Sequence, residues 1–399
     1  MAGRKILFIS GSIGLGHVTR DLAIANSLRK QNPGIEISWI ASEPASNVII
    51  EAGEKTIPAS KDWANENVVA ESSAQGNKLN LVTMLSDIRD AWKHNVGVFM
   101  EVTAKENFDL VIGDETYEII VAFKRKPELK TMPFVIIYDF IGSYAMTKNP
   151  MDVFGNYYWN YFWSKDFHKP SPFVDMRLFV GELEDIPDTK FGFLLPRRRA
   201  WAQEKCTFSG YILRFDPKKY VNKKEIRAKL GYGDEPVIVC SIGGTSIGKE
   251  MLRLCGRSFP IIKEKIPNAR MVLVCGPRLA SETLKATEGT EISGYVPNLY
   301  EHFAACDLAV VQAGATTTIE LTALRKPFLY FPLENHYEQR IHVRHRLARH
   351  NAGVFMDYSN TTPQSLADAI VRNVRTKVDC ANVSTNGAQK AAELISKLL

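Results

Sequence analysis

The sequence predicts an α/β protein built from two facing Rossmann-like domains, each a doubly wound parallel sheet, with a cleft between them. Two observations lead to this prediction. Short apolar runs that end in glycine-rich turns and lead into helical patterns occur in the first half of the chain and return in the second half, as expected for βαβ units. The length of 399 residues also exceeds what one hydrophobic core usually supports, so we expect two domains.

The first domain opens with an apolar run at residues 6–9, followed by a glycine-rich turn at residues 11–17. The residues after this turn place Leu22, Ala25 and Leu28 on one side of a helix. Residues 35–40 alternate apolar and polar side chains as a strand does, and short apolar runs predict further strands at residues 110–112 and 134–138. Short, continuous apolar strands of this kind suit a sheet that helices cover on both faces.

The second domain repeats this pattern without repeating the sequence itself. Four apolar runs, each ending near a glycine or proline, predict strands at residues 237–240, 271–275, 308–311 and 328–331. We therefore place an N-terminal domain at residues 1–212 and a C-terminal domain at residues 213–385. Residues 386–399 form a short amphipathic helix that can pack back on the N-terminal domain.

The composition is that of an ordinary globular protein and excludes several classes. With 45% hydrophobic and 24% charged residues, the chain is neither disordered, collagenous nor a coiled coil. The net charge of +6, from 50 basic and 44 acidic residues, permits an anionic ligand or a membrane surface. It is too mild to indicate a nucleic-acid binder.

Cysteine usage and hydropathy predict where the protein works. None of the six cysteines forms a C-x-x-C pair, which argues against a zinc ribbon or a thioredoxin-type site. The first apolar run is too short for a signal peptide, and no segment approaches the length of a membrane-spanning helix. We expect a cytoplasmic protein that is at most peripheral, at the inner face of the membrane.

The first glycine-rich turn has the spacing G-x-x-G-x-G at Gly11, Gly14 and Gly16, and His17 follows directly. The NAD fingerprint needs G-x-G-x-x-G, and a P-loop needs a lysine where His17 stands, so both are disfavoured. A glycine turn at a helix N-terminus can hold an anion or an acceptor oxygen on its backbone N–H groups. In the first helical turn, the helix dipole would keep His17 a neutral base. The alternative is a turn that serves only close packing, with an exposed histidine.

Asp114 follows the strand predicted at residues 110–112. A carboxylate there could accept a hydrogen bond from Nδ1 of His17 and stabilise the imidazolium after proton removal. The alternative is an acid that caps a helix or faces solvent. The neighbouring Glu115 is a second candidate for the partner of His17.

A turn rich in hydroxyl groups follows the strand predicted at residues 308–311. Gly314, Thr316 and Thr317 offer a close backbone approach, hydroxyls and helix N-terminal amides, which suit a diphosphate. Glu320, one helical turn further on, could accept hydrogen bonds from ribose hydroxyls. The alternative is an ordinary threonine N-cap with a capping-box acid.

Taken together, these segments resemble the GT-B glycosyltransferases, in particular family 28, which includes the lipid-linked N-acetylglucosaminyltransferase of peptidoglycan synthesis, and the UDP-glycosyltransferase superfamily. The resemblance implies that His17 is the catalytic base and Asp114 its partner. It also implies that Gly14, Gly16 and Arg20 belong to the loop on the acceptor side.

The resemblance further assigns a donor site to the second half. Its implied residues are Gly243, Gly244 and Thr245 near the phosphates, Tyr295 and Val296 near the uracil, Gly314, Thr316 and Thr317 at the diphosphate, Glu320 at the ribose, and Glu338 and Gln339 at the sugar. Two positions depart from the family pattern. Gln312 replaces the phosphate-binding histidine of many plant members, and Tyr295 replaces the usual tryptophan.

The implied reaction is inverting, metal-independent transfer of a hexose or N-acetylhexosamine from a UDP-sugar to the hydroxyl of a small or lipid-linked acceptor. The chain contains no D-x-D motif, so helix N-terminal amides and hydroxyls would stabilise the leaving UDP. No cofactor besides the UDP-sugar substrate is expected. The alternatives are a UDP-N-acetylglucosamine 2-epimerase or nucleotide-sugar hydrolase, for which Asp139 and Glu334 are the additional acids, and an inactive scaffold that binds the donor.

Two further patterns allow a functional and a structural interpretation. The aromatic run at residues 154–163 shows no clean period and could dock a lipid-linked acceptor or a bilayer, helped by the basic triplets at residues 124–126 and 197–199. The sequence favours an aromatic subcore with solvated charges instead. His342, His345 and His350 lie among arginines and predict a basic helix surface, not a metal site.

Overall fold

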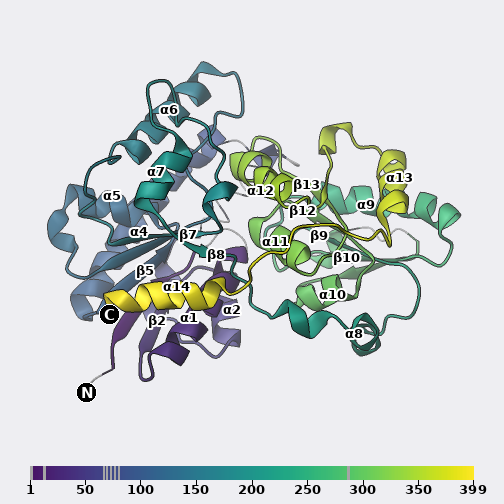
Figure 1. Ribbon diagram of the computed structural model, residues 1–399, viewed down its shortest axis with the longest axis horizontal. Helices are drawn as coiled ribbons and strands as arrows, with labels where there is room; N and C mark the ends of the chain where they lie inside the picture. The colour runs from purple at the N-terminus through teal and green to yellow at the C-terminus, as the bar shows by residue number, and fades with distance from the viewer. Residues whose placement is uncertain are drawn as a thin grey trace. The chain divides into compact units, whose positions relative to one another are not determined.

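The computed structural model describes residues 3–11, 15–65, 68, 71, 74–75, 78–79, 81–284 and 288–399. The chain divides into two compact units (Figure 1). Unit 1 comprises Met1–Ser73, Leu81–Arg214 and Ser384–Leu399, and unit 2 comprises Ala74–Asn80 and Phe215–Val383.

Unit 1 contains a six-stranded sheet in the order β2-β1-β5-β6-β7-β8, and all neighbouring strands are parallel. The strands are β1 (Lys5–Ile9), β2 (Glu36–Ile40), β5 (Leu110–Asp114), β6 (Phe134–Tyr138), β7 (Met176–Val180) and β8 (Thr207–Gly210). The helices are α1 (Gly16–Gln31), α2 (Ala45–Glu51), α4 (Leu81–Lys105), α5 (Tyr117–Arg125), α6 (Pro150–Ser164), α7 (Arg198–Lys205) and α14 (Gly387–Ile395).

Unit 2 repeats this arrangement with a parallel sheet in the order β11-β10-β9-β12-β13-β14. Its strands are β9 (Val237–Ser241), β10 (Arg270–Val274), β11 (Thr290–Ser293), β12 (Leu308–Gln312), β13 (Phe328–Phe331) and β14 (Val354–Phe355). Its helices are α8 (Lys223–Leu230), α9 (Lys249–Lys265), α10 (Leu299–Ala305), α11 (Ala315–Ala323), α12 (Arg344–Arg349) and α13 (Pro363–Asn373). A short antiparallel pair joins β3 (Ala74–Gln75) to β4 (Lys78–Leu79).

Each sheet is apolar on both faces, because helices cover both. Along β1, Ile6 and Phe8 belong to the core on one face of the sheet, and Leu7 and Ile9 belong to the core on the other. This alternation is expected where side chains of a strand point to opposite faces. The prediction of two doubly wound α/β halves is therefore confirmed.

In each sheet, the direction in which successive strands are added reverses at one point. The chain proceeds from β1 outward to β2 and then crosses to β5, and in unit 2 it crosses from the β11 side to β12. In doubly wound sheets, ligands bind outside the carboxyl ends of the strands at such a switch point. The residues that follow β1, β5, β9 and β12 are therefore the first to consider for a site.

The C-terminal helix α14 belongs to unit 1, where it lies against α1 (Figure 1). Ala391, Ala392 and Ile395 are fully buried in the same core as Leu28 of α1. Gly387, the first residue of α14, is needed for this approach, because a Cβ there would lie 2.4 Å from the carbonyl oxygen of Tyr211.

The aromatic run at residues 154–163 forms most of helix α6, which begins with Pro150 after the N-cap Asn149. Trp159 and Trp163 both pack near the ring of Tyr117, so an aromatic subcore exists as the sequence favours. The other side of the helix carries large apolar side chains that are exposed to solvent. The aromatic residues hide the helical period, because they occupy both sides of the helix.

The basic triplet at residues 197–199 does not form the solvated patch that the sequence suggests. Arg198 is buried, donates a hydrogen bond from Nη2 to the carbonyl oxygen of Ser143 at 2.6 Å and stacks on the ring of Tyr144. Arg199 donates to the carbonyl oxygen of Ile186. The triplet mainly fastens α7 to the preceding loops, and only Arg197 of the three is largely exposed.

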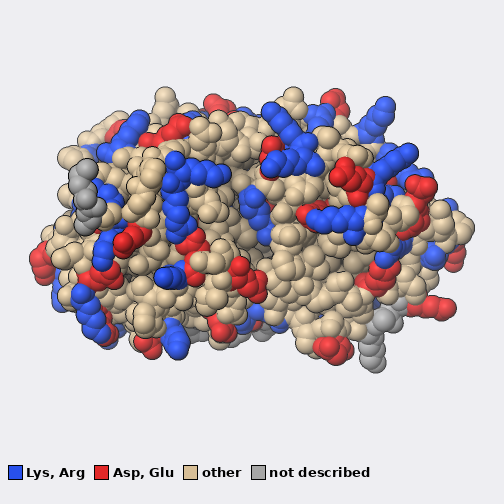
Figure 2. Space-filling model, turned by 90° about the horizontal axis from the view of Figure 1, so that it is seen from below, with Lys and Arg blue, Asp and Glu red and all other residues tan. Residues whose placement is uncertain are grey.

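Charges of both signs are interspersed on the face of the molecule that Figure 2 presents. This mixed distribution agrees with the mild net charge of +6. Among the helices of the described residues, none combines the length and the apolar character needed to cross a bilayer.

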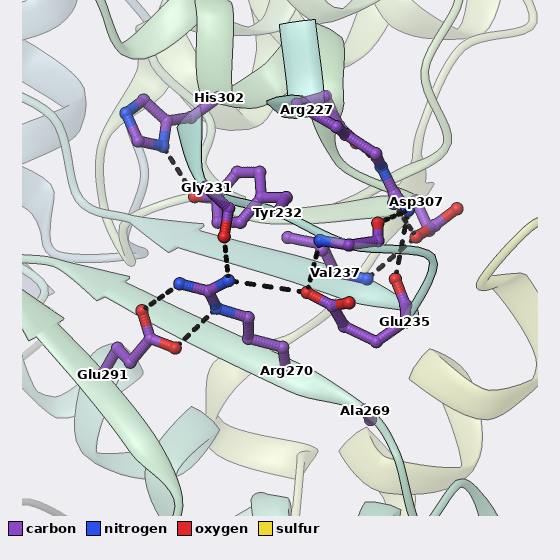
Figure 3. A network of polar contacts seen from close by, with 12 residues as sticks. Arg227, Gly231, Tyr232, Glu235, Val237, Ala269, Arg270, Glu291, His302 and Asp307 are labelled. Atoms are coloured by element: carbon purple, nitrogen blue, oxygen red, sulfur yellow. Dashed lines mark hydrogen bonds and ion pairs between the residues drawn. The ribbon is translucent and has the colours of Figure 1, made fainter. Parts of the chain in front are cut away.

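A polar network fastens the amino-terminal edge of the sheet in unit 2 (Figure 3). Asp307, directly before β12, accepts hydrogen bonds from Nη2 of Arg227 at 2.5 Å, from Nζ of Lys223 at 2.6 Å and from the backbone N–H of Val237 at 2.8 Å. Burial alone would raise the pKa of Asp307, but Lys223, the Val237 N–H and Arg227 together lower it below its ordinary value. The network joins α8, β9 and β12.

We expect Asp307→Asn to lower the free energy of unfolding by about 3 kcal/mol near pH 7, because it leaves the buried Arg227 without its counter-charge. The folded-state pKa of Asp307 is depressed, so its stabilisation is present above the unfolded-state pKa of about 3.9 and is lost as the pH falls through the folded-state pKa. Urea unfolding at neutral and acidic pH measures this difference. Asp368→Asn, which removes the exposed partner of Lys265, is the control and should change little. An equal effect of both variants would contradict the role of Asp307.

Candidate functional site

His17 is the second residue of α1 and lies beyond the carboxyl end of β1. Gly11 lies close to this side chain: a Cβ at position 11 would lie 3.0 Å from Cγ and Nδ1 of His17, so a larger residue there would require the imidazole to shift. Gly16 is the first residue of α1. Gly14, which we predicted in the same loop, lies outside the described residues.

The structure brings His17 and Asp114 together across 97 positions of sequence. Nδ1 of His17 lies 3.0 Å from Oδ2 of Asp114, the last residue of β5. The Asp114 side chain is fully buried, whereas that of His17 is 17% exposed. The imidazole therefore contacts the buried carboxylate through Nδ1 and retains access to solvent. Of the two candidates for the partner of His17, Asp114 is thus the one that faces Nδ1.

Arg20 joins the same group through a fork of hydrogen bonds. Its Nε and Nη2 donate to the two carboxylate oxygens of Asp114 at 2.9 and 2.6 Å, and its Nη1 donates to Asp139 at 2.6 Å. Nη2 of Arg20 also lies 2.8 Å from Nδ1 of His17. Asp139, which we considered only for the alternative activities, follows β6 and is thus part of the group around His17.

The pKa of His17 is raised above its ordinary value, opposite to what the helix dipole predicts. Burial and the charge of Arg20 lower this pKa, but the attraction and hydrogen bond of Asp114, with a smaller attraction from Asp139, outweigh them. The carboxylates of Asp114 and Asp139, at the ends of β5 and β6, thus determine the direction of the pKa shift of His17, and the dipole of α1 does not.

Sequence reasoning missed Asp21, which lies beneath this group. It is fully buried and accepts a hydrogen bond from Oγ of Ser10 at 2.6 Å. Burial and the nearby charge of Asp114 raise the pKa of Asp21 well above its ordinary value, which favours the protonated acid. The spacing of His17, Arg20 and Asp21 was the available signal, because residues three and four apart share one face of a helix.

Three side chains, including that of His17, are close enough together to be considered as metal ligands, although no metal is expected to take part in the reaction. Ligand atoms of His17, Asp114 and Glu115 all lie within 4.8 Å of one another. The guanidinium of Arg20 already contacts both oxygens of Asp114. A divalent cation would therefore have to compete with a buried positive charge for this carboxylate.

In unit 2, the turn after β9 is held by the end of β12. Gln312, the last residue of β12, is buried and donates from Nε2 to the carbonyl oxygen of Ile247 at 2.7 Å. Gly248 permits this contact, because a Cβ there would lie 1.9 Å from the same Nε2 atom. Gln312 is therefore a support of the turn that contains Gly243, Gly244 and Thr245.

Helix α11 begins directly after this point, with Gly314 as its N-cap. The alternative of an ordinary threonine N-cap is therefore wrong, because the N-cap is Gly314. Space is open beside Gly314, where a Cβ would meet no atom within 4 Å. Thr316 and Thr317 are half-buried in the first turn of α11, while Glu320 is buried in its middle.

The remaining predicted donor residues lie after β11 and β13. Tyr295 and Val296 are half-buried in the turn that follows β11. Glu338 and Gln339 begin a short π-helix, Glu338–Val343. Gln339 is buried, and its Oε1 accepts a hydrogen bond from the Leu333 N–H at 2.9 Å, so only its amide NH₂ remains to donate to a ligand.

The histidines that follow do not form the basic surface that we predicted. His342 and His350 are buried, and His345 is half-buried. The difference arises because Val343 and Leu347 pack into the core of unit 2 and carry this side of the helical segment inward.

The sequence of residues 238–399 matches the family described as Glycosyltransferase family 28 C-terminal domain. The chain is a relative of the family 28 glycosyltransferases. An uncharacterized glycosyltransferase of Methanopyrus kandleri is 25% identical over 48% of this chain and 54% of its own length. The UDP-N-acetylglucosamine–N-acetylmuramyl-(pentapeptide) pyrophosphoryl-undecaprenol N-acetylglucosamine transferase of Clostridioides difficile is 26% identical over 98% of this chain and 87% of its own length.

A solved structure extends the likeness to the fold. The crystal structure of the glycotransferase of kitacinnamycin matches with a TM-score of 0.63 at 15% identity, over all of both chains. The resemblance to GT-B and family 28 glycosyltransferases is therefore confirmed. The chain spans about half the length of the Methanopyrus kandleri relative. The roles of the individual site residues stay predictions.

Proposed function

We propose that this family 28 relative is an inverting, metal-independent glycosyltransferase that moves a hexose or N-acetylhexosamine from a UDP-sugar to an acceptor hydroxyl. The observation that supports this most is the group of His17, Asp114 and Arg20 at the switch point of unit 1. It combines a partly exposed imidazole with a buried carboxylate at 3.0 Å, which is the arrangement of an oriented general base.

His17 acts as the base through Nε2 in this proposal. This role requires the tautomer in which Nδ1–H donates to Asp114 and Nη2 of Arg20 donates to Asp114 and not to Nδ1. The lone pair of the neutral ring then lies on Nε2, and Nε2 takes the proton of the acceptor hydroxyl. The acceptor oxygen then forms its bond to the anomeric carbon from one side while the bond from that carbon to the UDP oxygen breaks on the other, which inverts the configuration. The imidazolium that results is stabilised by Asp114, whose attraction already favours the charged ring.

The donor binds unit 2 in this proposal. Open space beside Gly314, the N-cap of α11, suits a diphosphate, because the N-terminus of a helix carries partial positive charge. Thr316 and Thr317 would add hydroxyl donors, and the turn supported by Gln312 would approach the phosphates from β9. The Clostridioides difficile relative carries UDP-N-acetylglucosamine in its name, which supports a UDP-sugar donor.

The acceptor and the location are proposed at a coarser level. The name of the same relative contains a pyrophosphoryl-undecaprenol acceptor, so we propose that the acceptor is either a small molecule or a lipid-linked one. We place the protein in the cytoplasm, with peripheral association at the inner face of the membrane.

The test is release of UDP from a panel of UDP-sugars, with and without acceptors from a lipid extract and a small-molecule panel. Release that depends on acceptor, with a glycosylated product, supports the transferase. Release to water alone identifies a hydrolase, epimer formation without acceptor identifies an epimerase, and UDP binding without turnover identifies a scaffold. The last three outcomes each contradict the proposal.

We expect the same transfer reaction to keep its rate in EDTA, because the amides and hydroxyls at α11 can stabilise the leaving diphosphate without a metal. The measurement is UDP release before and after chelation, with Mg²⁺ or Mn²⁺ added back. Loss of activity in EDTA and recovery on adding metal would contradict the metal-free mechanism and direct attention to His17, Asp114 and Glu115 as ligands.

A further inference from the structure

An exposed apolar ridge runs along helix α6. Met151 and Phe154 are 72% and 71% exposed, and Tyr158, Tyr161 and Phe162 are exposed as well. Their spacing of three to four residues places them on one side of the helix. Trp159 and Trp163 on the other side make the contacts with the rest of unit 1, so packing within the unit does not explain the ridge.

A second element adds two apolar side chains next to α6. The backbone pairs Lys190 with Arg197, and the tight turn between them carries Phe193 and Leu194, which are 79% and 82% exposed. Oη of Tyr157 donates to the carbonyl oxygen of Phe193 at 3.2 Å, which fastens this turn to the helix. The ridge and the turn tip, here called the apolar surface, thus belong to one region of unit 1.

The tip of the turn is unfavourable for folding in two respects. Leu194 has a φ of +59°, a left-handed conformation that favours glycine or asparagine. The hydrogen bond from the Leu195 N–H to the carbonyl oxygen of Gly192 closes the turn around it. A leucine that is both exposed and in this conformation contributes little to the fold, and its side chain is accessible to a partner outside the chain.

Charge identifies the partner. From residue 143 to 165 the only acidic residue is Asp152, and it is buried against Thr147. Lysines at positions 148 and 165 flank α6, and the Lys165 ammonium lies 4.7 Å from the Phe162 ring centre. Lys190 stands at the base of the turn, whereas Arg197 is paired with Asp188. Asp188 is an exposed acid beside the turn, but Arg197 pairs with it. Tyrosine, phenylalanine and lysine, with this acid neutralised, is the composition that favours an anionic lipid interface.

We propose that the apolar surface binds anionic phospholipid bilayers, with α6 in the interface plane and Phe193 and Leu194 inserted between the headgroups. This deepens the peripheral location within the proposed function, but the binding itself needs neither donor nor acceptor. A bilayer fits better than a protein partner, because the side chains form a ridge and a tip that project from two elements, and these insert into a fluid surface without a complementary shape.

The test is co-sedimentation of the full chain with phosphatidylcholine vesicles that contain, or lack, about 30% phosphatidylglycerol. We expect binding to the anionic vesicles that weakens with salt. Phe193→Ser/Leu194→Ser and Phe154→Ser/Tyr158→Ser should each bind at least about tenfold more weakly, because each removes two large apolar contacts. Replacing the three lysines at 148, 165 and 190 by glutamine should remove most of the preference for phosphatidylglycerol.

Two variants separate lipid binding from folding. Leu194→Gly should keep or raise the thermal unfolding midpoint, because glycine adopts the left-handed conformation freely, and should still weaken vesicle binding. Ile50→Ser, at an exposed apolar position of α2 in the same unit, should bind vesicles as the wild type does. UDP affinity should not change in any of these variants.

Wild-type protein that stays in the supernatant, or variants that sediment like the wild type, would overturn the proposal. A dimer in solution that dissociates in Phe154→Ser/Tyr158→Ser would overturn it as well, because a second copy would then be the occupant. These results are independent of UDP release, so failure here and failure of the proposed transferase activity can be told apart.

Discussion

His17→Ala is expected to lower the turnover of acceptor-dependent UDP release by at least about 10²-fold while leaving UDP affinity near that of the wild type. The loss arises because no other group accepts the hydroxyl proton at this position in the proposed mechanism. UDP affinity should persist, since the proposed donor residues lie in unit 2 and His17 lies in unit 1. Steady-state UDP release and calorimetric titration of UDP measure the two quantities.

The pH profile adds a second test of the same residue. The base must be neutral to act, so activity should fall on the acidic side with an apparent pKa above 6.5, the ordinary value for His17. In Asp114→Asn this acidic limb should move to lower pH, because the attraction that raises the pKa of His17 is gone. His168→Ala, at an exposed histidine of the same unit, serves as the control. Wild-type turnover in His17→Ala would refute the assignment of the base.

The fold was predictable from the sequence because its signals are local. The apolar runs at residues 134–138 and 328–331 coincide with β6 and β13, since a strand buried on both faces needs a continuous apolar run. The sequence did not show which side of α6 is buried, because aromatic residues occupy both its buried and its exposed side. Which of them are exposed depends on the rings of other elements, and no period in the sequence records that.

The candidate site was predictable in its members but not in its connections. The glycine turn identifies His17, and the position at the end of β5 identifies Asp114. The fork of Arg20 is not visible in the sequence, because its partners Asp114 and Asp139 are 94 and 119 positions away. The same applies to Gln312, whose contact with Ile247 spans 65 positions. Side-chain contacts between strand ends are decided by topology, and only the structure supplies them.

The connections around Arg20 have a consequence for stability as well as for the base. Arg20 is nearly fully buried, and it offsets two carboxylates that are buried with it. Burial alone would raise the pKa of Asp114, but Arg20 and His17 lower it below its ordinary value. The guanidinium therefore keeps Asp114 ionised, and an ionised Asp114 is what orients His17.

Arg20→Met is expected to lower the free energy of unfolding by about 3–5 kcal/mol at pH 7, because it leaves Asp114 and Asp139 buried without their cation. In the wild type, the depressed pKa of Asp114 means that its stabilisation is present above about pH 3.9 and is lost as the pH falls through the folded-state pKa. In Arg20→Met, the contribution of these carboxyls to the free energy of unfolding changes with pH in the opposite direction. Burial without a cation raises the folded-state pKa of these carboxyls, so the variant regains stability as the pH falls through that raised value.

The measurement is urea unfolding of both proteins from pH 7 down to about pH 4, where the unfolded carboxyls begin to take up protons. The difference in free energy of unfolding between wild type and Arg20→Met should decrease steadily as the pH falls. Arg4→Met is the control in the same unit, because Arg4 and its partner Asp109 are 61% and 37% exposed, and its smaller effect should not reverse with pH. A constant gap between wild type and Arg20→Met at every pH would mean that lost packing, and not uncompensated charge, is the cause, and Arg20 would then not be the group that keeps Asp114 ionised.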